Sequence, residues 1–334
     1  MANVTRDDVA RLAGVSVAVV SYVLNDGPRR VAPATAEKVR RAVAELGYRP
    51  SRLAAALRSG RSRTLGLITP DTTHPYLALL TKAVEDAAYA RGHLLLVGNS
   101  GRRTGRERHY LGAFADLKVA GVLLMSSVAT VADDADLPVV LLDRPSADGH
   151  SAVLADNVAG AELATGHLLG HGRRATACLT GPAESVNAAE RRAGYERALA
   201  RAGLAPGPVR HGPFSRAFGH AAGRELLTAP DRPDAVFVAS DQQAVGLLSA
   251  AYELGVAVPD DLAVAAFDDV PEAAYTAPPL TTVTTPIDRL AETAVDLVLE
   301  GAERGRTVRL PVTLHRRRSC GCAAEDTAEK EVEM

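Results

Sequence analysis

The sequence predicts an all-α module near the N-terminus, followed by a two-lobed α/β body. Two observations lead to this prediction. Residues 5–46 show helical spacing of apolar residues with capping residues at the expected ends, whereas from Thr64 onwards short apolar runs alternate with helix-length stretches. The chain has 334 residues, of which 47% are hydrophobic, so it is long enough for more than one compact unit with its own core.

The first two helices are predicted from their capping residues and a glycine turn. Thr5 is expected to cap a helix that ends at Ala13, with Asp8 completing a capping box. Gly14 permits a sharp turn, and Ser16 is then positioned to cap a second helix that ends near residue 24. With a third helix packed against them, two helices joined in this way form a helix-turn-helix, although an ordinary helical cap on the body is the alternative.

The third helix is expected over 34–46, with Val39, Val43 and Leu46 facing inward. Ala32 precedes it and has no side-chain oxygen, so the cap is either weak or supplied by Thr35. A short segment, 51–63, then follows as a helix and linker.

The outward side of the second helix and the charge around it favour DNA as the partner. Val17, Ala18, Ser21 and Tyr22 are small, apolar or hydroxylic, which lets a helix approach base edges closely. Residues 1–63 contain 12 Lys and Arg against 5 Asp and Glu, although the whole chain has a net charge of −2. A basic segment on an acidic body indicates a polyanion partner for that segment alone, and an uneven surface charge arising by chance is the alternative.

Eight apolar runs predict the strands of the body: 64–71, 93–100, 121–127, 138–143, 151–156, 175–181, 234–240 and 262–269. Runs that are apolar throughout are typical of parallel strands covered by helices on both faces. The helices between them are expected at 75–91, 157–169, 187–202, 242–254 and 287–300. This alternation predicts doubly wound α/β structure, and its length is generous for one sheet, so we expect two lobes.

Composition predicts no membrane span, no cofactor and no metal site. No basic start leads into an apolar run, and no stretch approaches ~20 apolar residues, so the expected location is the cytoplasm. Three cysteines are too few for a disulfide framework. The Cys320-Gly-Cys322 pair lacks the spacing of a four-ligand zinc site, so we expect free thiols in a tail.

The motifs "VARLAGVSVAVVSYVLN" and "AELGYRPSRLAAALRSGRSRTLGLI", with the α/β body behind them, resemble the lactose/galactose repressor family over nearly the whole chain. The resemblance implies that the body has the two-lobed, type I periplasmic-binding-protein-like fold. It implies four parts: a helix-turn-helix DNA-binding domain at 1–50, a hinge helix and linker at 51–63, an effector-binding and dimerisation domain at 64–318, and an acidic tail at 319–334.

Within the body, the resemblance implies a first lobe of 64–157 plus the helix 287–300, and a second lobe of 158–284. A last strand near 307–313 would close the second lobe.

The resemblance also assigns the DNA contacts. In that family the hinge becomes helical only on DNA, and a leucine, here Leu57, wedges into a base step of the minor groove. Tyr22 stands where many members have an arginine, so we expect thymine-methyl contacts from Val17 or Ala18 instead of bidentate reading of guanine. The expected DNA-binding residues are Thr5, Ser16, Val17, Ala18, Ser21, Tyr22, Asn25, Arg29, Arg52, Ala54, Leu57 and Arg58.

Polar residues at strand ends predict an effector site, because ligands bind beyond the carboxyl ends of parallel strands. Carboxylates accept hydrogen bonds from hydroxyls and a guanidinium donates two in a fixed fork, a combination that suits a sugar. Asp241 is expected only to cap the helix that follows it. By motif position in the family, the expected effector contacts are Asp71, His74, Tyr76, Asp143, Arg191, Ser240 and Asp268.

These features together predict a sequence-specific DNA-binding transcription regulator, and specifically a repressor. Its partners would be a pseudo-palindromic operator in double-stranded DNA, a small polar effector such as a carbohydrate, and a second copy of the chain in a homodimer. A sugar-binding transport protein without a DNA role and an enzyme acting in the cleft stay open as alternatives. The sequence lacks a phosphate-binding glycine loop, a His-Glu-x-x-His motif and a nucleophile elbow, so we do not expect an enzyme.

Overall fold

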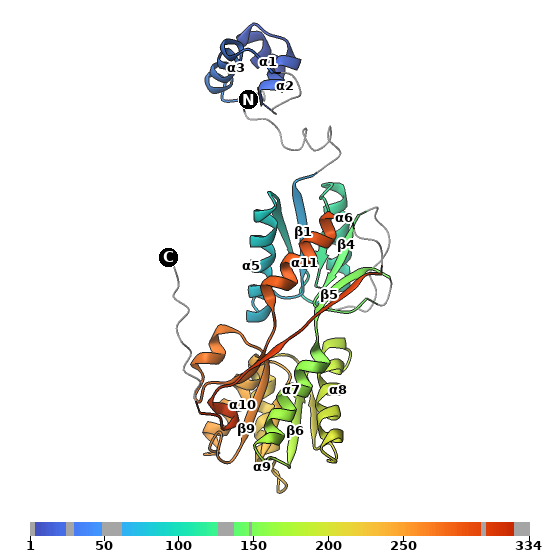
Figure 1. Cartoon of the computed structure of the whole chain (residues 1–334), viewed down its shortest axis with the longest axis vertical. Helices are drawn as coiled ribbons and strands as arrows, with labels where there is room; N and C mark the ends of the chain where they lie inside the picture. The colour runs from blue at the N-terminus through green and yellow to red at the C-terminus, as the bar shows by residue number, and fades with distance from the viewer. Residues whose placement is uncertain are drawn as a thin grey trace. The chain divides into compact units, whose positions relative to one another are not determined.

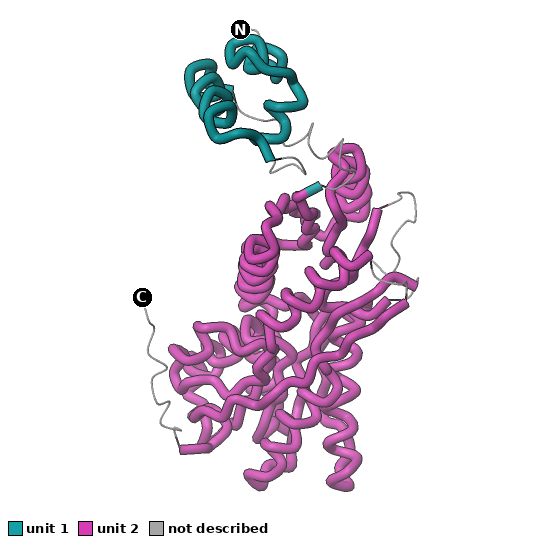
Figure 2. Tube along the Cα trace, turned by 45° about the horizontal axis from the view of Figure 1, so that its top comes forward, with its two compact units in different colours: residues 1–62 teal, residues 63–334 magenta. Residues whose placement is uncertain are grey.

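The structure is a computed structural model that describes residues 4–24, 30–48, 62–125, 137–146, 149–301 and 305–323. The chain divides into two compact units, unit 1 at Met1–Ser62 and unit 2 at Arg63–Met334 (Figure 2). No helix within the described ranges is long and apolar enough to cross a membrane.

Unit 1 contains three helices: α1 (Arg6–Ala13), α2 (Val17–Leu24) and α3 (Pro33–Glu45). The predicted capping box is confirmed, because the Thr5 side chain accepts from the Asp8 N–H while the Asp8 carboxylate accepts from the Thr5 N–H at 2.9 Å. Gly14 ends α1 with φ +64°, a backbone conformation that favours glycine.

The core of unit 1 is formed where the three helices meet. Its buried residues are Val9, Ala10, Val20, Val39 and Ala42, and Val43 and Leu46 pack against them, so the expected inward face of α3 is confirmed. Of the two alternatives for the start of α3, the weak cap is confirmed, because no side chain caps this helix and Thr35 does not supply one. Pro33 at its first position has no N–H to satisfy, which lowers the need for a cap.

The first lobe of unit 2 is built on a six-stranded parallel sheet with strand order β11-β5-β4-β3-β1-β2. Helices α5 (Pro75–Ala90) and α11 (Ile287–Leu299) pack on each other, and α6 (Thr104–Asp116) packs on β1 and β2 (Figure 1). The strands are β1 (Thr64–Thr69), β2 (Leu94–Asn99), β3 (Val122–Leu124), β4 (Val139–Leu142), β5 (Ser151–Ala155) and β11 (Thr307–Leu310).

The second lobe has a six-stranded sheet with order β12-β10-β9-β8-β6-β7, parallel except for β12, which pairs antiparallel with β10. Helices α7 (Asn157–Gly170) and α8 (Val186–Arg201) form one packed pair, and α9 (Arg216–Thr228) and α10 (Asp241–Glu253) form another. The strands are β6 (Thr176–Thr180), β7 (Val209–His211), β8 (Ala235–Val238), β9 (Ala263–Asp268), β10 (Thr281–Thr284) and β12 (Thr313–His315).

All eight predicted strands and all five predicted helices of the body are present, and α11 lies in the first lobe as expected. The expected strand over 307–313 was wrong. Its first part, β11, pairs with β5 in the first lobe, and β12 pairs with β10 in the second, so the chain crosses between lobes here (Figure 1). Pro311 lies between the two strands and has no N–H for a ladder, which favours the break.

The predicted tail also begins too early. Ser319 and Cys320, in the short 3-10 helix η2 (Arg318–Cys320), are fully buried in the second lobe. The Ser319 hydroxyl donates to the Val264 carbonyl at 2.7 Å and accepts from the Thr281 N–H at 2.8 Å. The segment through residue 320 is therefore part of the lobe.

Candidate functional site

The exposed side chains at the start of α2 are small, and they are either apolar or hydroxylic. Ser16, Val17 and Ala18 are exposed at its N-terminal turn, whereas Val20 on the opposite side is fully buried. Ser16 also caps the helix, because its Oγ accepts from the Val19 N–H at 3.3 Å. Tyr22 is half-buried. This edge is slim enough for its backbone to approach base edges in a major groove.

The other expected DNA contacts divide into two groups. Thr5 serves as the N-cap of α1, and Ser21 is half-buried on α2. The rest lie outside the described residues, namely Asn25, Arg29, Arg52, Ala54, Leu57 and Arg58.

A cavity of about 330 Å³ lies between the two lobes of unit 2. Its size is at the lower end of the ~300–1,000 Å³ range of ligand pockets. His74, Tyr76 and Asp143 line it from the first lobe, and Arg191 and Asp268 line it from the second. The structure thus brings together five of the seven residues that the sequence assigned to an effector.

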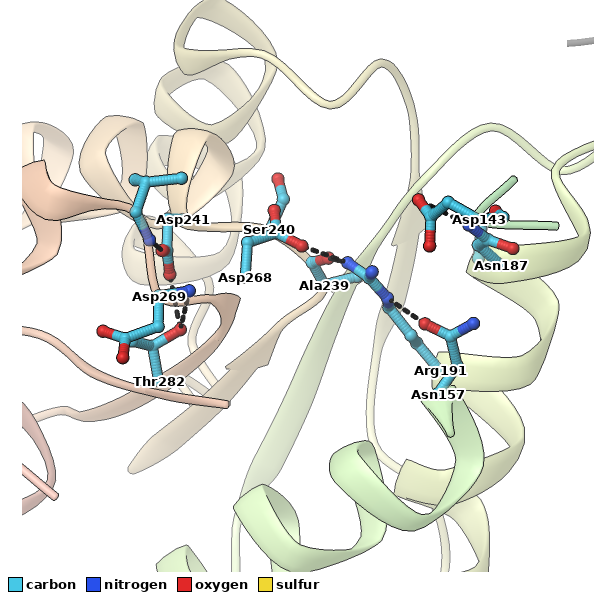
Figure 3. Close-up of polar contacts among 12 residues, drawn as sticks. Asp143, Asn157, Asn187, Arg191, Ala239, Ser240, Asp241, Asp268, Asp269 and Thr282 are labelled. Carbon is cyan, nitrogen blue, oxygen red and sulfur yellow. Dashed lines mark hydrogen bonds and ion pairs between the residues drawn. The ribbon is translucent and has the colours of Figure 1, made fainter. Parts of the chain in front are cut away.

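Arg191, on α8, is held rigidly at the centre of this site. Its Nη1 donates to Asp268 Oδ1 at 3.0 Å and to the Ala239 carbonyl at 2.6 Å, and its Nε donates to Asn157 Oδ1 at 2.8 Å (Figure 3). The guanidinium carbon also stands 3.7 Å from the centre of the Phe267 ring. The hydrogen bonds found among the described residues leave Nη2 for a ligand.

Two cavity carboxylates stand on strained backbone. Asp143 directly follows β4 and has φ +59°, and Asp268 ends β9 with φ +115°. Such angles are uncommon outside glycine and are retained mainly where a side chain must point in a particular direction. Burial raises the pKa of Asp268, and the Arg191 guanidinium beside it acts in the opposite direction.

Several buried polar atoms at the cavity lack a well-formed hydrogen bond within the described part of the chain. They are Oη of Tyr76, Oδ1 of Asp143, Oδ1 of Asn187 and both ring nitrogens of His74. Buried polar groups in native proteins are nearly always hydrogen-bonded, so donors and acceptors clustered in this way indicate a polar ligand or ordered water. Hydroxyl groups, which both donate and accept, match this mixed set.

Asp143 makes the stability of the ligand-free protein depend on pH. Burial raises its pKa to about 7, against the influence of Arg191, whereas an unfolded Asp has a pKa of about 3.9. The native state then binds this proton more tightly than the unfolded state. The stabilisation is therefore present at about pH 4 and is lost as the pH rises through about 7.

Replacing Asp143 with Asn should therefore stabilise the ligand-free protein at pH 8, by up to about 4 kcal/mol, and should flatten its stability between pH 5 and 8. Asn is tolerated at positive φ, so the backbone need not change. Urea unfolding at both pH values measures the effect. The matched control is Asp231→Asn, at an exposed turn. If the stability of Asp143→Asn changes with pH as that of wild type does, the Asp143 carboxyl is not the source of the pH dependence.

Two expected effector residues do not line the cavity. Ser240 is 1% exposed and caps α10, with its Oγ accepting from the Gln243 N–H at 3.3 Å. The Asp71 carboxylate accepts from the N–H of Thr73 at 2.9 Å and from the hydroxyl of Thr73 at 2.7 Å. These two bonds form a local turn. Their side chains therefore have structural partners away from the cavity.

The expected cap from Asp241 was wrong, because Ser240 caps α10 instead. The Asp241 carboxylate is fully buried and accepts from the Val270 N–H at 2.8 Å and the Thr282 hydroxyl at 2.6 Å (Figure 3). It therefore ties the start of α10 to the strand β10.

Sequence reasoning missed two residues of the site, Asn157 and Asn187. Asn157 orients Arg191, and Asn187 donates through Nδ2 to the Asp143 carbonyl at 2.8 Å. Phe214 also lines the cavity and offers a ring at its wall. Spacing could have found Asn187, because it precedes Arg191 by one helical turn and so shares its face of α8.

Comparison with known protein families gives two matches. Residues 5–51 match the model described as bacterial regulatory proteins, lacI family, and residues 165–320 match a periplasmic binding protein-like domain. The chain is 37% identical over 267 residues to the ribose operon repressor of Escherichia coli strain K12, covering 77% of this chain and 81% of that protein. It is 35% identical over 267 residues to the HTH-type transcriptional repressor PurR of Vibrio atlanticus strain LGP32, covering 77% and 80%.

Solved structures agree with these matches. A lac repressor dimer bound to operator and the anti-inducer ONPF has a TM-score of 0.87 at 30% identity, over 96% of this chain and 99% of that chain. A complex of the transcriptional regulator CelR with cellobiose has a TM-score of 0.70 at 33% identity, over 95% and 99%. The expected fold, a helix-turn-helix with a two-lobed periplasmic-binding-protein-like body, is thereby confirmed.

Proposed function

Because this chain belongs to the lacI family of bacterial regulatory proteins, we propose that it is a transcriptional repressor whose operator affinity is set by a small sugar. Unit 1 binds operator DNA through the exposed turn of α2, and the cavity of unit 2 binds the effector. The observation that carries the proposal is the group of unsatisfied buried polar atoms around a fixed Arg191. Because a repressor acts on the chromosome, we place the protein in the cytoplasm and assign it no catalytic activity.

A monosaccharide is the effector that this cavity favours. Arg191 and Asp268 offer a fork donor and a carboxylate acceptor, which match adjacent hydroxyls. Phe214 supplies an apolar ring for the face of a sugar, and the cavity is small for an oligosaccharide. The name of the ribose operon repressor and the cellobiose complex of CelR point to the same class of ligand.

Coupling between effector and DNA follows from the position of the cavity. A ligand that contacts Asp143 and Arg191 together stabilises one relative angle of the lobes. In a homodimer that angle sets the distance between the two hinge segments, in which we propose that Leu57 enters the minor groove between Arg52 and Arg58. Such coupling is reciprocal and typically amounts to ~1–3 kcal/mol.

Removing residues 1–62 should abolish operator binding and leave effector binding unchanged, since unit 2 has its own cores. Footprinting on the DNA beside the gene that encodes the protein, repeated with a panel of monosaccharides, identifies the operator and the effector. Calorimetry with the same sugars then compares full-length and truncated protein. Operator binding that survives the truncation would contradict the proposal, and so would a footprint that no sugar alters.

A further inference from the structure

Four side chains of types that can bind a metal meet in the second lobe, and none of them lines the cavity. His167 and His171 lie at the C-terminal end of α7, and Cys320 and Cys322 lie at and just after η2. His167 Nε2 stands 3.2 Å from Cys320 Sγ and 3.3 Å from Cys322 Sγ. His171 Nε2 stands 3.3 Å from His167 Nε2 and 3.4 Å from Cys322 Sγ.

The fold holds each half of this cluster independently. The two histidines are one helical turn apart and so share one face of α7. Gly321, with φ +102°, turns the chain between the cysteines so that both thiols face that helix. The 3-10 helix before it is fixed by the buried hydroxyl of Ser319, which bonds to Val264 and Thr281.

We propose that His167, His171, Cys320 and Cys322 bind one zinc ion in a tetrahedral structural site. Zinc takes four ligands of this kind, at ~2.3 Å from sulfur and ~2.0–2.1 Å from nitrogen. Tetrahedral bonds of these lengths place neighbouring ligand atoms roughly 3.3–3.8 Å apart, close to the separations found here. All four ligand atoms lie within 4.8 Å of one another, which leaves room for a single ion rather than a cluster.

The donor set selects zinc over the common hard cations. Magnesium and calcium prefer oxygen ligands, whereas a tetrahedral set of two thiolates and two imidazoles is typical of zinc. Two thiolates also neutralise the charge of the ion. The hydroxyl of Thr281 lies 3.1 Å from Cys320 Sγ and can donate to that ligand, as outer-shell groups of zinc sites do.

The expectation of no metal site rested on local spacing alone. Cys320 and Cys322 do lack two further ligands nearby in the sequence, but the fold supplies them from α7, about 150 residues earlier. Zinc bound at this position links residues 320–322, which follow β12, to α7, the helix that follows β5. It therefore closes a loop that contains most of the second lobe, which constrains the unfolded chain.

The test uses full-length protein purified without added metal and then analysed for bound metals by mass spectrometry. We expect about one zinc ion per chain, and a lower Tm after removal of zinc with a chelator. Replacement of zinc by cobalt should produce sulfur-to-cobalt charge-transfer bands and the intense visible bands of a tetrahedral ion. The paired substitution Cys320→Ser and Cys322→Ser should remove both the zinc and these bands.

Matched controls separate metal binding from a general loss of folding. His171→Ala replaces an exposed ligand and should keep the fold while it weakens zinc binding at least tenfold. His220→Ala, on α9, and Cys178→Ala, in β6, should leave zinc content unchanged. Wild-type protein without zinc, cobalt bands or a chelator effect on Tm would overturn the proposal, and so would a Cys320–Cys322 disulfide in protein kept under reducing conditions.

Discussion

Replacing Arg191 with Ala is expected to remove the response to the effector, with a loss of effector affinity of about 3 kcal/mol, roughly 100-fold. Arg191 and Asp268 are each about 4% exposed, so their charges have almost no water to replace the lost partner. The substitution also removes the bonds to Asn157 and the Ala239 carbonyl. Operator binding without effector should persist, because these residues lie in unit 2.

A second variant distinguishes lost recognition from lost folding. Arg191→Ala leaves the buried Asp268 carboxylate uncompensated, which alone costs about 3–5 kcal/mol of stability. The double variant Arg191→Met with Asp268→Asn removes both charges and should recover much of that stability without recovering effector affinity. Calorimetry with the effector and urea unfolding measure the two quantities separately.

Arg192→Ala is the matched control for Arg191. Arg192 is its neighbour on α8, is 43% exposed and pairs with Glu196, so its loss should change stability by under about 0.5 kcal/mol and leave affinity unchanged. If Arg191→Ala folds normally and binds the effector within threefold of wild type, Arg191 is not an effector contact.

Replacing Ala18 with Glu is expected to lower operator affinity by at least about 100-fold, because a carboxylate would stand at the turn of α2 that we propose faces the bases and phosphates. Ala18 is exposed, so the change should leave the three-helix core intact. Electrophoretic mobility shift at two salt concentrations measures the loss. Effector binding to unit 2 should not change.

The control for Ala18→Glu makes the same substitution on another helix of unit 1. Ala44 is exposed near the end of α3, so Ala44→Glu adds the same charge away from the exposed turn of α2. Its effect on operator affinity should stay within about threefold, the size of a weak phosphate repulsion. Equal losses in the two variants would show that the net charge of unit 1 determines operator binding, and not the position of the charge on α2.

Much of the site could be predicted because short-range rules place its residues. Asp143 follows an apolar run and Asp268 ends another, and the ends of parallel strands meet at one edge of a sheet. Arg191 was assigned by its motif position in the family, and the predicted helix 187–202 placed it on α8. Ser240 caps α10 in place of Asp241, since either residue can cap a helix and the choice depends on where Val270 and Thr282 bind the Asp241 carboxylate.

The sequence by itself determined the three helices of unit 1, the eight apolar strands of unit 2 and the polar residues at their ends. Each of these depends on residues only a few positions apart, through caps, turns and the period of apolar side chains. Tertiary structure alone decided that β11 and β12 join different sheets, and that two histidines of α7 meet two cysteines near the end of the described chain. Contacts across about 150 residues depend on how whole layers pack, and no local spacing encodes that packing.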